Sequence, residues 1–172
     1  MKSIKMYAVA VVATLVSATS FAQKTKTVVG NAVATENLTT LVAALKAADL
    51  VTTLSGAGPF TVFAPTNKAF DKLPKGTLDM LLKPENKAKL SAILTYHVIA
   101  GVVNSNDVVA AIEKGNGSAT LTTVQGGKLT ATMVGKNVIL MDEKRNKSII
   151  TSVDIMSSNG IVHIIDTVMM PN

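Results

Sequence analysis

Two histidines and one carboxylate are the groups of this chain most suited to chemistry. An imidazole beside a carboxylate can transfer protons or bind a metal ion, which points to His97, His163 and Asp166. Side chains alternate along a strand, so His163 shares a face with Ile161 and Ile165, whereas Asp166 points to the other face. A catalytic zinc ion usually needs a third protein ligand, and the pattern fixes none. We therefore predict no catalytic residue, no metal site and no cofactor.

The same polar residues fit a structural role better. Unsatisfied polar groups in an apolar setting cost about 1–3 kcal/mol, so buried ones must find hydrogen-bond partners. His97 and Asp166 occur amid apolar residues, and Thr66, Asn67, His97 and Asp166 are the members of the expected network. We expect these four side chains to bond one another in one polar knot that joins segments distant in sequence.

The segment Gly58–Phe70 reads as strand, turn and helix. Phe60–Ala64 is an apolar run of strand length, and Pro65 ends it. Asn67 then has a side chain suited to capping a helix.

A second segment of this kind, Ser158–Pro171, closes the chain. Asn159-Gly160 is a tight-turn dipeptide, and the β-branched run Ile161–Ile165 follows it as a strand. The element Tyr96-His97-Val98 lies between the two segments. Together they resemble the two signature boxes and the Tyr-His element of the fasciclin domain, over about Thr35 to Pro171.

The resemblance implies an adhesion or interaction module outside the cytoplasm, and not an enzyme. In animal fasciclin domains the Tyr-His element and its aliphatic neighbours are tied to adhesion. The matching residues are Tyr96, His97, Val98 and Ile99. The resemblance therefore makes these four the first candidates for partner binding.

A second adhesive motif of that family contains Asp-Ile shortly before the second box. Asp154 and Ile155 match it, followed by Met156, but Ser152-Val153 stands where the animal motif has an acid and a proline. Ile155 and Met156 fit a buried strand more readily than a contact surface. Asp154, if exposed, would be an acidic contact with a partner.

The first residues predict export. Lys2 and Lys5 precede the uncharged stretch Tyr7–Val16, and small residues lead to a cleavage site after Ala22. We predict a signal peptide at 1–22 and a secreted or periplasmic protein, with no membrane insertion after cleavage. Residues 23–34 are expected to be a flexible N-terminal segment, and residues 35–171 one fasciclin-like domain.

Charge and composition exclude some partners. The formal charge of +6 falls to +4 when Lys2 and Lys5 leave with the leader, and the remaining lysines are scattered. Binding to nucleic acid would need a basic stripe with stacking aromatics, yet aromatic residues make up only 3% of the chain. We expect a cell-surface or matrix protein or polysaccharide as partner, and no nucleic acid.

The pattern predicts an α+β fold. Leu38, Leu41, Val42 and Leu45 recur at helical spacing after Asn37. Strand-like runs follow in the second half, at 118–124, 128–134, 137–141, 148–155 and 161–168. Together with the resemblance, this predicts antiparallel strands that form a wedge of two small sheets, with short helices packed around it.

The most favoured function is an exported fasciclin-like adhesion or protein-interaction module. The alternative is an envelope carrier of a small apolar ligand, which would need a cavity lined by Met, Leu and Val. A hydrolase ranks last, because the chain lacks cysteine and shows no serine in a nucleophile elbow.

Overall fold

The computed structural model describes residues 26–172, so the signal peptide expected at 1–22 and its cleavage after Ala22 lie outside the described residues. The helices are α1 (Val28–Val33), η1 (Glu36–Leu38), α2 (Thr39–Ala47), α3 (Val51–Ser55), α4 (Asn67–Asp71), α5 (Thr77–Leu81), η2 (Pro84–Asn86), α6 (Lys87–Tyr96) and α7 (Ser105–Lys114). The strands are β1 (Phe60–Pro65), β2 (Val98–Ala100), β3 (Ser118–Thr122), β4 (Lys128–Val134), β5 (Asn137–Met141), β6 (Lys147–Ser157) and β7 (Gly160–Ile165). Helices thus dominate the first half and strands the second, as the pattern predicted.

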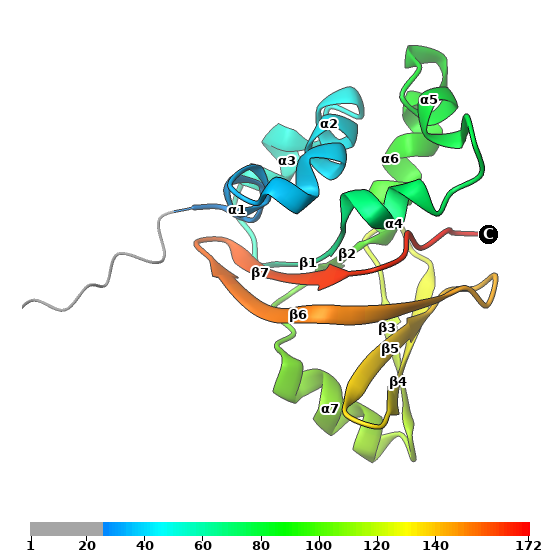
Figure 1. Ribbon diagram of the computed structural model, residues 1–172. Coiled ribbons are helices and arrows are strands. Elements are labelled where there is room, and N and C mark those ends of the chain that lie inside the picture. The colour runs from blue at the N-terminus through cyan, green and yellow to red at the C-terminus, as the bar shows by residue number, and fades with distance from the viewer. Residues whose placement is uncertain (1–25) are drawn as a thin grey trace, which may run out of the picture.

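The strands form one seven-stranded sheet in the order β2-β1-β7-β6-β5-β4-β3. The long strand β6 joins its two parts, because Lys147–Ile149 pair with β5 and the remainder pairs with β7. Figure 1 shows β6 running between β1, β2 and β7 on one side and β3, β4 and β5 on the other. The N–H of Val124, just after β3, donates to the carbonyl of Val98 in β2 at 2.7 Å, so the sheet nearly closes. The expected division into two small sheets is not confirmed, since β6 belongs to both parts.

Strands β1 and β7 lie side by side and run parallel, from Phe60 opposite Gly160 to Pro65 opposite Ile165. The two segments that carry the sequence resemblance therefore meet in space. The remaining strand pairs are antiparallel as expected, but this central pair is not. Parallel pairing needs a long crossover, which the intervening chain supplies. A Cβ on Gly160 would lie 1.9 Å from the carbonyl oxygen of Phe60, so glycine is required for this close approach.

Two apolar clusters pack against opposite faces of β1 and β7. The first, here called the helical core, holds Val62 of β1 and Val162 of β7 beneath α1, α2, α3 and α6. In the second, here called the strand core, Phe63 and Ile165 face α7 and strands β3 to β6. Because both faces of β1 and β7 are buried, these strands read as near-continuous apolar runs rather than as an alternation.

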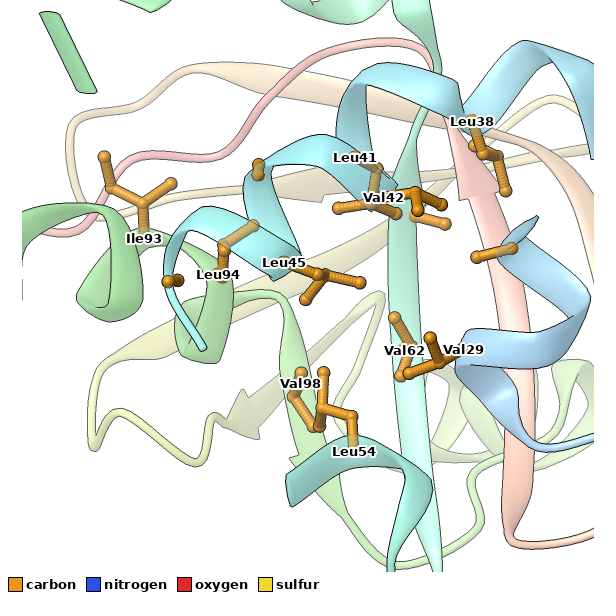
Figure 2. Close-up of a cluster of buried hydrophobic side chains, with 14 of the residues drawn as sticks. Val29, Leu38, Leu41, Val42, Leu45, Leu54, Val62, Ile93, Leu94 and Val98 are labelled. Carbon is orange, nitrogen blue, oxygen red and sulfur yellow. The ribbon is translucent and has the colours of Figure 1, made fainter. Parts of the chain in front are cut away.

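The helical core depends on the spacing predicted for α2. Figure 2 shows Leu41, Val42 and Leu45 of α2 beside Leu94 of α6 and Val62 of β1. Burying each such side chain stabilises the fold by about 1.5–3 kcal/mol.

The start of the described chain also belongs to this core. Helix α1 buries Val28, Val29 and Ala32. The expectation of a flexible segment at 23–34 therefore does not fit α1, whose residues Val28, Val29 and Ala32 are buried where it contacts α2 and α3. Within residues 26–172, no helix combines the length and the apolar character that crossing a bilayer requires.

Candidate functional site

The Tyr-His element lies inside the protein. Tyr96 ends α6, His97 follows as its C-cap, and β2 begins at Val98. The side chains of Tyr96, His97, Val98 and Ile99 are 0%, 2%, 2% and 6% exposed. These four residues were predicted to contact a partner, but their burial does not allow direct contact in this conformation.

Tyr96 connects the end of α6 with two strand-region segments through its hydroxyl group. The hydroxyl donates to the carbonyl oxygen of Lys128 at 2.7 Å and accepts the N–H of Glu143 at 3.3 Å. Burial raises the pKa of Tyr96 to about 12, so the hydroxyl stays protonated and able to donate at neutral pH. The ring also packs against Gly127, where an added Cβ would lie 2.5 Å from it.

His97 uses both ring nitrogens to connect α6 with the C-terminal segment. Its Nε2 accepts the N–H of Met169 at 3.0 Å, so the proton resides on Nδ1, which lies 2.8 Å from the carbonyl oxygen of Ile93. Burial lowers the pKa of His97 to about 4, although the Ile93 carbonyl and Asp142 oppose this shift. The imidazole is therefore neutral at physiological pH.

His163 has the same arrangement in β7. Its Nδ1 accepts the N–H of Asp154 at 3.3 Å, and its Nε2 donates to the carbonyl oxygen of Val103 at 2.9 Å. The ring stacks on Phe63, with centroids 5.5 Å apart. Both histidines thus act as internal cross-links between backbone groups.

This use of both nitrogens leaves neither imidazole a free lone pair for a metal ion or a substrate. Among residues 26–172, no group of three or more His, Asp or Glu side chains could hold a metal ion. The ring nitrogens of both histidines are thus engaged in hydrogen bonds within the fold.

Thr66 and Asn67 act on two different helices. Thr66 is the N-cap of α4, and its hydroxyl accepts the N–H of Ala69 at 3.2 Å. Asn67 was expected to cap this helix, but its Oδ1 instead accepts the N–H of Thr40 at 2.9 Å, in the first turn of α2. Helix α2 has no side-chain cap of its own, so Asn67 supplies one from a distant segment.

Asp166 holds the end of β7 to the start of β6. Its Oδ1 accepts the N–H of Ile149 at 2.8 Å, and its Oδ2 lies 3.2 Å from Nζ of Lys72. Partial burial works against ionisation, but these donors and Thr167 hold the pKa of Asp166 below its usual value.

The single polar knot is thus not formed, because its four predicted members act at separate places. The hydrogen bonds of Asn67, His97 and Asp166 go to α2, to the C-terminal segment and to β6 rather than to one another. The physical reason is that each of these three side chains accepts the backbone N–H of a different segment, from Thr40, Met169 and Ile149 respectively.

Asn159 is a further structural residue that sequence reasoning treated only as part of a turn. Its Oδ1 accepts the N–H of Val28 at 2.9 Å, and its Nδ2 donates to the carbonyl oxygens of Leu54 and Gly56, both at 2.8 Å. It therefore satisfies the start of α1 and the end of α3 together. The only sequence signal for this role of Asn159 was indirect. Short helices need hydrogen-bond partners for their terminal backbone groups, and an asparagine elsewhere in the chain can supply them.

Asp154 sits in a β-bulge of β6. The register shifts between Ser152 and Ile155, and Asp154 has a positive φ of 58°, which aspartate tolerates better than most residues. Its Oδ1 accepts the N–H of Ser105 at 2.8 Å, and its Oδ2 accepts the Ser105 hydroxyl. Since Ser105 begins α7, the carboxylate also lies at the positive end of that helix. Asp154 is half-buried and engaged within the fold.

The two residues after Asp154 differ in exposure. Ile155 is half-buried against the helical core. Met156, expected as strand core, is 48% exposed instead. Strand β6 carries two register shifts against β7, between Ile150 and Ser152 and between Ser152 and Ile155, so simple alternation does not decide which of its side chains face inward.

Met156 contributes to a surface groove at the end of β6, here called the turn groove. It has a volume of about 440 Å³, and its lining residues are Ala57, Gly58, Pro59, Val102, Met156, Ser157, Ser158, Asn159 and Gly160. Val102, like Met156, is 48% exposed. The groove joins three segments far apart in sequence, and the sequence pattern indicated neither Val102 nor Pro59 as part of a surface.

A cavity inside the helical core is far smaller than this groove. The cavity within the helical core, bordered by Val29, Leu45, Val62 and their neighbours, measures about 10 Å³. That volume is about the minimum for one water molecule. The structure of residues 26–172 thus gives no support to the alternative of a carrier that encloses an apolar ligand.

Comparisons with known proteins agree with this architecture. A family model described as Fasciclin domain matches residues 36–171. Protein sll1483 of Synechocystis is 46% identical over 145 residues, which span 84% of this chain and 73% of that protein. Cell surface glycolipoprotein MPB83 of Mycobacterium bovis is 43% identical over 123 residues, 72% of this chain and 48% of that one.

A solved structure shows the same fold at low sequence identity. It is a FAS1 domain pair from the insect cell adhesion molecule fasciclin I, with a TM-score of 0.74 and 19% identity. The match covers 84% of this chain and 50% of the other.

Proposed function

Since the chain belongs to the fasciclin domain family, we propose that it is an exported adhesion or protein-interaction module that contacts its partner through the turn groove. The proposal assigns it no catalytic step. Export rests on the leader-like residues 1–22, and a relative named as a cell-surface glycolipoprotein agrees with it.

The observation that carries this proposal is the exposure of Val102 and Met156 on one groove. Apolar side chains that gather in a concave surface are typical anchors of protein interfaces. A standard interface buries about 800 Å² on each partner, so the groove would form its centre and the neighbouring surface its rim.

Asp154 and Ile155 shape the edge of this surface in the proposal. Asp154 lies in the bulge and bonds Ser105, and the exposed Met156 lies two residues further along the strand. The buried residues Tyr96 to Ile99 contribute indirectly, because they hold the rigid scaffold that presents the groove. Their family role in adhesion would then be one of stability.

The test is binding of the purified protein to intact cells of the producing organism, measured by flow cytometry. We expect Val102→Glu and Met156→Glu to weaken binding at least about tenfold, because a charge cannot enter an apolar interface without losing its hydration. Met80→Glu is the matched control, since Met80 is also exposed but lies on α5.

Circular dichroism and thermal unfolding must first show that the variants fold. If both groove variants fold and bind as the wild type does, the turn groove is not the contact surface.

A further inference from the structure

A second groove, here called the C-terminal groove, lies at the other end of β6. Its volume is about 260 Å³, and its lining residues are Lys89, Ala92, Ile93, Gln125, Lys144, Met170, Pro171 and Asn172. These residues come from α6, the β3–β4 turn, the β5–β6 turn and the C-terminal segment. In Figure 1 the C-terminal end and the β5–β6 turn lie at one end of the molecule, and the β6–β7 turn lies at the opposite end.

Two lysines from separate elements flank this groove. Lys89 and Lys144 are both exposed, and within residues 26–172 neither forms an ion pair with a carboxylate. Their positive charges are therefore available to an anion from outside the chain.

The neighbouring acids are occupied elsewhere. Asp142 is buried, its Oδ1 accepts the N–H of Asn146 at 2.8 Å, and its Oδ2 accepts the N–H of Met170 at 2.9 Å. Oε1 of Glu143 accepts the N–H of Lys128 at 3.1 Å. Hydrogen bonds within the fold thus engage both oxygens of Asp142 and one oxygen of Glu143, and within residues 26–172 neither acid forms an ion pair with a groove lysine.

The groove between the lysines is lined by apolar and fixed side chains. Ala92, Ile93, Met170 and Pro171 supply aliphatic surface. The backbone of the C-terminal segment is fixed at two successive residues. The N–H of Met169 donates to the His97 ring, and the N–H of Met170 donates to the Asp142 carboxylate. A groove held in this way needs little ordering when a ligand binds, which favours affinity.

We propose that the C-terminal groove binds a carboxylate-bearing sugar unit of an acidic polysaccharide. The lysine ammonium groups would pair with the carboxylate, the aliphatic surface would cover the C–H face of the ring, and the Gln125 amide would bond hydroxyl groups. The volume is below the roughly 300–1,000 Å³ of sites for drug-sized ligands, which suits one ring at a time.

This site is independent of the turn groove and goes beyond the proposed function. Strand β6 has 11 residues and separates the two grooves by about 35 Å, at about 3.3 Å per residue. One domain would thereby hold a polysaccharide at one end and a protein at the other, which is the geometry that a bridging module requires.

The test is isothermal titration of the purified chain with a short oligogalacturonate at low and high salt. We expect saturable binding that weakens with salt. The double variant Lys89→Gln/Lys144→Gln should raise Kd roughly tenfold, because two contacts to the carboxylate are lost. The matched control Lys46→Gln/Lys114→Gln removes the same charge from exposed lysines of α2 and α7 and should change Kd less than about twofold.

Several results would overturn the site. They are absence of oligogalacturonate binding, an equal loss in the control variant, and equal binding of a neutral galactose oligomer. Competition by oligoglutamate or inorganic phosphate at the same concentration would likewise overturn the site, because it would show that the groove attracts any anion.

Amide shifts in an NMR titration should map to α6, the β5–β6 turn and the C-terminal segment. Because the groove lysines are not part of the turn groove, failure here leaves the cell-binding test of Met156→Glu unaffected.

Discussion

The Tyr-His element and the turn groove contrast in the way each uses its side chains. Both contain residues that the family resemblance linked to adhesion. In the first, Tyr96 and His97 are buried, and their polar side-chain atoms bond backbone groups of other segments. In the second, Val102 and Met156 are exposed and apolar. The difference teaches that a motif identifies residues that matter, whereas burial decides whether they matter for stability or for contact.

The largest effect is expected from His97→Ala. The substitution leaves the Met169 N–H and the Ile93 carbonyl without a partner and opens a cavity, so the free energy of unfolding should fall by about 3 kcal/mol. For a domain of this size the melting temperature should fall by about 10 °C. Urea unfolding and a thermal scan measure both. A melting temperature equal to that of the wild type would show that His97 does not stabilise the fold.

Acidification should have a similar but graded effect on the wild type. The pKa of His97 is lowered to about 4 in the folded protein, against about 6.5 when unfolded. The unfolded state therefore binds the proton first, and stability is lost as the pH falls from 6.5 to about 4, by up to about 3 kcal/mol.

The matched comparison for this pH effect is the His97→Ala variant. Its unfolding free energy, measured by urea titration at several pH values, should lack this part of the slope. Parallel pH profiles for the two proteins would contradict the assignment to His97.

Tyr96→Phe tests the same buried element more mildly. Loss of the hydroxyl leaves the Lys128 carbonyl without this donor while the ring still fills the strand core, so the free energy of unfolding should fall by about 1–2 kcal/mol. Chemical denaturation measures the change. A loss as large as that of His97→Ala would indicate that the ring, not the bond, had been disturbed.

The smallest change in stability is expected in the turn groove. Met156→Ser removes an exposed side chain, so the free energy of unfolding should change by less than about 0.5 kcal/mol. The same variant should weaken cell binding in flow cytometry. If it destabilised the domain as much as Tyr96→Phe does, Met156 would belong to the core, and the contrast between the two regions would fail.

The order of the elements was predictable because it depends on local patterns, whereas the expectation that the two signature segments meet rested on the family resemblance. Asn159-Gly160 and the apolar runs of β1 and β7 are read directly from the chain. The capping of α2 by Asn67 was not predictable in this way, because its partner Thr40 is 27 residues away and a side chain of this type usually caps its own helix.

The bulge at Asp154 shows the same limit for the candidate surface. Ile155 and Met156 were both expected in the strand core, yet Met156 is exposed, and this part of β6 is irregular, with two register shifts against β7. Sequence periodicity contains no signal for where a bulge falls.

The sequence by itself determined the residue types: two histidines, no cysteine, and two short segments whose apolar runs must be buried. Tertiary structure alone decided which backbone groups those polar side chains satisfy and which apolar side chains remain outside. The reason is that hydrogen bonds and burial depend on neighbours brought together by the sheet, and those neighbours lie tens of residues away along the chain.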